Sequence, residues 1–168
     1  MKDSALLKYF AYGSNMSVPR LQQRVPSARF IGTYYLPKHA LKFHKKGVDG
    51  SAKCDAYLTN SEDDVVYGVL FEYCPSEKHF LDAAEGLGVF YFEKDVTIYD
   101  ENHQAEQASL YYASDSTPNI QPFTWYKHHV FYGASEAKLP ADYLAKIDQI
   151  EAVDDTNAER RVKEMAIY

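Results

Sequence analysis

Cysteine is scarce in this chain of 168 residues, which contains only Cys54 and Cys74. The two residues do not have the spacing of a metal-binding motif. Two cysteines favour free thiols in a reducing cytosol, although a single disulfide between them stays open as an alternative. The cysteine content therefore indicates a cytoplasmic protein.

Long apolar runs and an excess of positive charge are also missing. No stretch approaches the length that crosses a bilayer, and the apolar run near the N-terminus is too short for a signal peptide. The formal net charge of -6 argues against a nucleic acid partner. We expect a soluble protein that binds neither membranes nor nucleic acids.

Motifs for cofactors and metals are absent as well. The chain has no Gly-x-Gly-x-x-Gly pattern and no P-loop, so no nucleotide cofactor is predicted. His128 and His129 are sequence neighbours that point in different directions, and no other ligand stands at a suitable spacing. Ser14 lacks the Gly-x-Ser-x-Gly elbow of a hydrolase nucleophile. We expect no cofactor and no metal.

Apolar and aromatic residues are plentiful, at 46% and 15% of the chain, and fifteen residues are tyrosine. Tyrosine suits half-buried strands, where the ring packs and the hydroxyl forms a hydrogen bond. This length and composition fit one domain, residues 1–168, with a substantial core.

Strand patterns dominate the first two thirds of the sequence, and helical patterns cluster late. Alternation predicts strands at 6–11, 29–36, 40–44, 54–59, 65–73, 90–99 and 107–113, with 54–59 and 65–73 forming a hairpin. Helices are predicted at 17–24, from Ser76 to Gly86, from Leu139 onwards, and after a capping box of Thr156 with Glu159. Segment 123–131 favours a helix or a turn. The fold class is α+β.

The first predicted strand ends at Gly13, and Ser14 and Asn15 follow as good helix caps. A strand, a tight turn and a helix start in this order would aim backbone N–H groups at one point, a suitable site for a carboxylate or an oxyanion. A plain connection between a strand and a helix is the simpler alternative.

Three blocks of sequence resemble the γ-glutamyl cyclotransferase family of the AIG2-like superfamily. The first is Tyr12-Gly13-Ser14-Asn15, and the second is Leu-Asp-Ala-Ala-Glu-Gly at 81–86 with Tyr91 downstream. The third runs from Gly133-Ala134 through Leu-Pro to Ile150. The resemblance implies a small, partly closed mixed β-barrel with helices packed around it, acting on a small-molecule γ-glutamyl substrate as a monomer or a homodimer.

The implied reaction is intramolecular: the free α-amino group of a γ-glutamyl compound attacks its own γ-carbonyl. The products are 5-oxoproline and a free amino acid or amine. By resemblance, Glu85 transfers the proton, residues 12–15 hold the substrate, and Tyr91 and Tyr126 lie near the pocket. Asn15 argues against the glutathione-specific branch, whose members carry a Tyr-Gly-Ser-Leu turn.

Glu85 is also unusual on physical grounds. A glutamate in the last turn of a helix faces the negative end of the helix dipole, which favours the protonated carboxyl and raises its pKa. A raised pKa suits a group that takes and returns a proton near neutral pH. A solvated glutamate at a helix end is the structural alternative, and a non-catalytic module that binds small carboxylates is the functional one.

Overall fold

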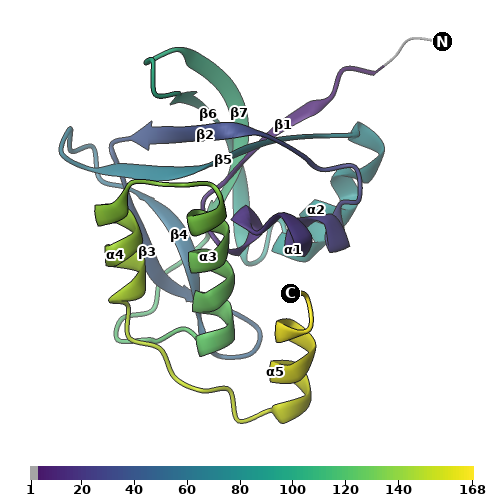
Figure 1. Cartoon of the computed structure of the whole chain (residues 1–168), viewed down its shortest axis with the longest axis vertical. Helices are drawn as coiled ribbons and strands as arrows, with labels where there is room; N and C mark the ends of the chain where they lie inside the picture. The colour runs from purple at the N-terminus through teal and green to yellow at the C-terminus, as the bar shows by residue number, and fades with distance from the viewer. Residues whose placement is uncertain (1–3) are drawn as a thin grey trace.

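The computed structural model describes residues 4–168, which form seven strands and five α-helices (Figure 1). The strands are β1 (Leu7–Ala11), β2 (Arg29–Pro37), β3 (His39–Lys46), β4 (Ala52–Leu58), β5 (Val65–Tyr73), β6 (Tyr91–Tyr99) and β7 (Ala105–Ala113). The helices are α1 (Val18–Arg24), α2 (Lys78–Glu85), α3 (Thr124–Glu136), α4 (Ala141–Asp148) and α5 (Ala158–Met165).

Five strands close into a barrel in the order β1-β5-β2-β6-β7. The barrel is mixed, because β1 runs antiparallel to β5 but parallel to β7, where Tyr9 lies opposite Ser109. The predicted α+β class, with a small mixed barrel and helices around it, is confirmed.

The predicted hairpin between 54–59 and 65–73 is wrong. Strand β4 pairs with β3 in a separate two-stranded sheet, with Cys54 opposite Phe43. The physical reason lies in the barrel: β5 uses both of its edges, one for β1 and the other for β2. No edge of β5 is left to receive β4, which extends away from the barrel behind α3 and α4 in the view of Figure 1.

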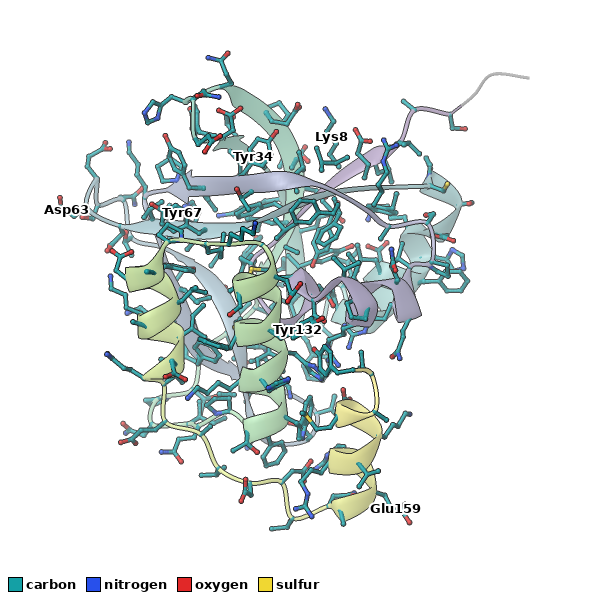
Figure 2. The ribbon with its side chains drawn as sticks, in the orientation of Figure 1. Lys8, Tyr34, Asp63, Tyr67, Tyr132 and Glu159 are labelled. Carbon is teal, nitrogen blue, oxygen red and sulfur yellow. The ribbon has the colours of Figure 1, made fainter. Side chains whose placement is uncertain are left out.

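The core fills the barrel and continues under the helices. Strand β5 is buried on both faces, as its apolar run predicted, with Val66, Val69, Leu70 and Phe71 at most 1% exposed. The inner face packs inside the barrel, and Tyr67 on the same strand contacts Tyr143 of α4 with ring centroids 5.1 Å apart (Figure 2). Burial of this kind stabilises by roughly 25 cal/mol for each Å² of apolar surface removed from water.

Helices α3 and α4 lie side by side below the barrel (Figure 1). The ambiguous segment 123–131 is helical and belongs to α3. This helix packs closely on the 3-10 turn Ser14–Met16 that follows β1. No helix within residues 4–168 has both the length and the apolar character to cross a bilayer.

The predicted helix caps need correction. Ser14 and Asn15 form the 3-10 turn, and Ser17 stands at the N-cap of α1 without a side-chain capping bond, its hydroxyl lying 3.0 Å from that of Tyr168 instead. A second 3-10 turn, Pro75–Glu77, precedes α2, so Ser76 lies before the cap position. Asn157 caps α5 in place of Thr156, because its side chain is at the position that reaches the backbone N–H of Arg160, 3.0 Å away.

Candidate active site

The turn after β1 brings unpaired backbone donors to the barrel rim. Within the described part of the chain, the N–H groups of Gly13, Ser14 and Asn15 donate to no other backbone group. Gly13 is needed for space, because a Cβ there would lie 3.0 Å from Cβ of Cys54 and 3.5 Å from the hydroxyl of Tyr126. A short turn with free donors can bind a carboxylate or an oxyanion.

Helix α2 ends at the second predicted block. Glu85 is its last residue, and Gly86 follows in the left-handed region at φ 63°. This conformation suits glycine and terminates the helix, as the sequence predicted. Oε1 of Glu85 accepts a hydrogen bond of 2.9 Å from Nδ2 of Asn15, so two blocks seventy residues apart in sequence are in direct contact.

One narrow pocket of about 40 Å³ is lined by all seven residues predicted for the site: Tyr12, Gly13, Ser14, Asn15, Glu85, Tyr91 and Tyr126. A wider cleft of about 460 Å³ opens next to it. Ser14, Glu85, Tyr91 and Tyr126 line both spaces, which makes them the boundary between the two. The arrangement suits a molecule with a slender end and a bulkier one.

Burial raises the pKa of the Glu85 carboxyl above its ordinary value. The positive charges of Arg24 and Arg20, together with the hydrogen bond from Asn15, offset part of this rise. The direction agrees with the prediction from the helix end, but burial by the surrounding barrel and helices is the leading cause. A rise in this direction brings the carboxyl closer to the pKa that suits proton exchange at neutral pH.

A chain of hydrogen bonds fixes the Glu85 side chain. Nη1 of Arg24 donates to Oδ1 of Asn15 at 3.1 Å, and Nδ2 of Asn15 donates both to Glu85 and to the hydroxyl of Tyr9, also at 3.1 Å. Arginine only donates and a carboxylate only accepts, so the orientation of the Asn15 amide follows from its two neighbours.

Replacing Arg24 with glutamine should raise the pKa of Glu85. The charge of Arg24 lowers that pKa in the native protein, and its removal leaves the effect of burial less opposed. Titration of the Glu85 carboxyl by ¹³C NMR measures the shift. Arg29→Gln is the matched control, since Arg29 is exposed on β2 and pairs with Glu72 at 2.7 Å. An unchanged Glu85 pKa in Arg24→Gln would contradict this account.

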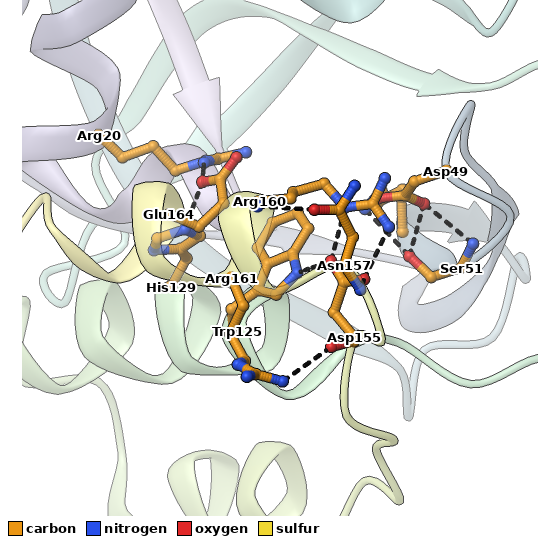
Figure 3. A network of polar contacts seen from close by, with 11 residues as sticks. Arg20, Asp49, Ser51, Trp125, His129, Asp155, Asn157, Arg160, Arg161 and Glu164 are labelled. Atoms are coloured by element: carbon orange, nitrogen blue, oxygen red, sulfur yellow. Dashed lines mark hydrogen bonds and ion pairs between the residues drawn. The ribbon is translucent and has the colours of Figure 1, made fainter.

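Arg160 and Glu164 of the C-terminal helix α5 line the cleft, and Figure 3 shows the polar contacts around them. Oε2 of Glu164 on α5 accepts from Arg20 at 2.6 Å and lies 2.9 Å from Nε2 of the fully buried His129. Nε1 of Trp125 donates to Asp155 at 2.8 Å. These contacts hold α5 against α1 and α3, so Glu164 keeps a fixed place beside the cleft.

Four further residues at or near the pocket escaped prediction: Tyr9, Cys54, Tyr111 and Arg24. Tyr9 lies on β1, three positions before Tyr12, which follows the end of that strand. This closeness in sequence is a weak signal that β1 approaches the site. Nothing in the local sequence of β4, β7 or α1 indicates the others, because the barrel closure and the packing of α1 bring them there.

Histidines and cysteines contribute no metal site among residues 4–168, where no group of three or more potential ligands converges. Both ring nitrogens of His129, one of the adjacent pair at 128–129, already have hydrogen-bond partners. Nε2 contacts Glu164, and Nδ1 lies 2.6 Å from the hydroxyl of Tyr168. Cys54 and Cys74 are both free thiols.

Known proteins resemble this chain over nearly its whole length. A γ-glutamylcyclotransferase of Bos taurus is 30% identical over 157 residues, covering 91% of this chain and 83% of its own. One of Homo sapiens is 30% identical over 158 residues, covering 92% and 84%. The chain belongs to the γ-glutamylcyclotransferase family.

Structure and family profile agree with this membership. A solved structure of a γ-glutamyl cyclotransferase superposes with a TM-score of 0.85 at 26% identity, covering 97% of this chain and 98% of that one. The AIG2-like family profile matches residues 65–147, which include Glu85, Tyr91 and Tyr126. The turn at 12–15 lies outside that match, and its place in the site rests on the geometry described above.

Proposed function

We propose that this protein is a γ-glutamylcyclotransferase, which converts γ-glutamyl compounds to 5-oxoproline and releases the attached amino acid or amine. One observation carries the proposal: Glu85, a carboxyl with a raised pKa, lines one narrow pocket together with Gly13, Ser14 and Asn15, whose backbone N–H groups donate to no other backbone group that the structure describes. Membership of the γ-glutamylcyclotransferase family supports it.

The reaction needs a base, an acid and donors for a developing negative charge. The ionised Glu85 takes a proton from the substrate's α-ammonium group, and the freed amine attacks the γ-carbonyl carbon. The new C–N bond closes a five-membered ring, and the carbonyl oxygen becomes an oxyanion beside preorganised donors. Glu85 then returns the proton to the departing nitrogen, and the oxyanion re-forms the carbonyl group as the original amide C–N bond breaks. The ring nitrogen gives its second proton to the released amine, so the products are 5-oxoproline and an ammonium group.

The nucleophile belongs to the substrate, so the protein supplies conformation rather than a reactive side chain. Cys54 lines the pocket but is 2% exposed, and burial raises the pKa of its thiol to about 12. At neutral pH the thiol stays protonated and is a poor nucleophile. The Cys54 side chain therefore fits a structural role in the site.

The shapes of the two spaces suggest how a substrate divides between them. The narrow pocket suits the slender γ-glutamyl chain, and the wider cleft suits the departing amino acid or amine. Free thiols at Cys54 and Cys74 fit a reducing compartment, and we extend the proposal to a cytoplasmic location.

The test is a panel of γ-glutamyl dipeptides and γ-glutamyl amines, each beside its N-acetylated form. Release of 5-oxoproline is expected only from compounds with a free α-amino group, because acetylation removes the nucleophile. Chromatography of the products measures it. Release of the amine from acetylated and free compounds at comparable rates would indicate ordinary hydrolysis and refute the proposal.

A further inference from the structure

Two tyrosine hydroxyls in the pocket contact the backbone of Cys54, one at its carbonyl oxygen and the other at its N–H group. The hydroxyl of Tyr91 lies 2.6 Å from the carbonyl oxygen of Cys54, and the hydroxyl of Tyr126 lies 2.9 Å from the N–H nitrogen of Cys54. Both contacts use the open edge of β4, whose other edge pairs with β3. In an antiparallel strand the N–H and C=O of one residue point to the same side.

Covalent chemistry fixes the direction of each bond. A carbonyl oxygen carries no hydrogen, so Tyr91 must donate its only proton to Cys54. A peptide N–H must itself donate, so Tyr126 accepts and keeps its own proton. Toward the pocket, Tyr91 therefore offers lone pairs alone, whereas Tyr126 offers a proton.

A second pair of tyrosine hydroxyls also consists of one that donates to the protein and one that accepts from it. Tyr12 donates to the carbonyl oxygen of Tyr111, and Tyr9 accepts from Nδ2 of Asn15. The pocket thus has acceptors in Tyr12 and Tyr91, beside the carboxylate of Glu85, and proton-bearing hydroxyls in Tyr9 and Tyr126.

We propose that Tyr91 accepts a hydrogen bond from the substrate's α-ammonium group and that Tyr126 donates one to a substrate oxygen. This inference rests on the proposed function, since it assumes a γ-glutamyl group in the pocket. The ammonium has three N–H groups and no lone pair, so it can be satisfied only by acceptors. Glu85 takes one N–H, and Tyr91 is an acceptor that lines the same two spaces as Glu85.

The assignment also explains how the amine becomes aligned for attack. Once Glu85 has removed one proton, the neutral amine has two N–H groups and one lone pair. An acceptor that holds an N–H limits the rotation of the amine, which favours a lone pair directed at the γ-carbonyl carbon. Tyr126, on the other side, can stabilise an oxygen that accepts hydrogen bonds.

Both hydroxyls keep their protons at neutral pH. Burial is the main cause that raises the pKa of Tyr91 and Tyr126 well above the ordinary tyrosine value. The nearest competitor for the Tyr126 proton is the thiol of Cys54. Sulfur is a weak acceptor, and a substrate oxygen is a stronger one.

Two small ligands separate the roles: L-glutamate carries the α-ammonium group, and glutarate is the same chain without it. Calorimetry gives the dissociation constant of each for the wild type, Tyr91→Phe and Tyr126→Phe. Tyr91→Phe should weaken glutamate roughly 10- to 150-fold, the range for hydrogen bonds to charged groups, and leave glutarate within about twofold. Tyr126→Phe should weaken both ligands by similar factors.

The controls address folding and the underlying function. Tyr67→Phe lies outside the pocket, against Tyr143, and should change neither constant. Melting temperatures show whether each variant keeps the fold. Equal weakening of both ligands by Tyr91→Phe, or no binding of either ligand to the wild type, would overturn the inference.

The 5-oxoproline assay on the same preparations keeps the two proposals apart. A wild-type protein that releases no 5-oxoproline but shows the ligand pattern would refute the function and leave the hydroxyl roles intact. If the wild type releases 5-oxoproline but Tyr91→Phe leaves glutamate binding unchanged, the hydroxyl roles are refuted and the function stays intact.

Discussion

Glu85→Gln should fold normally and lose about 10²- to 10⁴-fold or more in the rate of 5-oxoproline formation. Glutamine has nearly the size of glutamate, and its amide oxygen can still accept the hydrogen bond from Asn15. It cannot accept a proton, so the steps that need a base and an acid lose their group. The turnover rate under saturating substrate measures the loss.

Stability should move in the opposite direction from activity. The pKa of Glu85 is raised in the folded protein, so its favourable contribution exists below the unfolded pKa and is lost as pH rises through the folded pKa. Above the folded pKa the charged carboxylate destabilises the folded state, and Glu85→Gln removes that charge. The melting temperature at pH 7 should equal or exceed that of the wild type.

A structural glutamate would behave differently. Its replacement would lower the melting temperature and leave most of the turnover. Glu62→Gln, in an exposed turn, is the matched control and should change neither quantity. A destabilised Glu85→Gln protein that retains wild-type turnover would contradict the assignment of Glu85.

Gly133→Ala should cause a marked loss of stability through the addition of a single methyl group. A Cβ at position 133 would lie 2.4 Å from the backbone carbon of Met16 and 2.4 Å from the backbone nitrogen of Ser17. Backbone cannot rotate away, so α3 must move off the turn at 14–16. Overpacking of this kind costs roughly 1–3 kcal/mol, or about 2–12 °C in melting temperature at this chain length.

Gly32→Ala is the matched control for that prediction. A Cβ there meets only the ring of Tyr34, at 3.5 Å, which is an ordinary contact. Its melting temperature should stay the same or rise slightly, because alanine restricts the unfolded chain. Thermal unfolding followed by circular dichroism compares the variants, and a Gly133→Ala protein as stable as Gly32→Ala would contradict the close packing of α3 on the turn.

Local pattern was enough to predict the strands, most of the helices and the end of α2. Alternating residues such as those of β5, and a glycine such as Gly86 after a helical stripe, act within a few positions of the chain. Which strands pair with one another does not follow from local pattern. The sequence suggested a hairpin between β4 and β5, but the barrel closes through long-range contacts that local pattern does not contain.

The candidate site shows the same difference between features that the sequence predicts and contacts that only the fold creates. Family resemblance pointed to Glu85, Tyr91, Tyr126 and the turn at 12–15, and the fold gathers them around one pocket. The contacts that orient them come from positions without a local signal. Arg24 reaches Asn15 because α1 packs beside the turn, and the peptide groups of Cys54 reach two tyrosines because β4 has an open edge.

The fate of solvent oxygen tests the central claim most directly. A γ-glutamyl dipeptide is incubated with the protein in water enriched in oxygen-18, and the products are analysed by mass spectrometry. Intramolecular attack by the α-amino group predicts unlabelled 5-oxoproline, because no water oxygen enters the product. Glutamate carrying one oxygen-18 atom in its γ-carboxyl group would show that water is the nucleophile and would contradict cyclisation at Glu85.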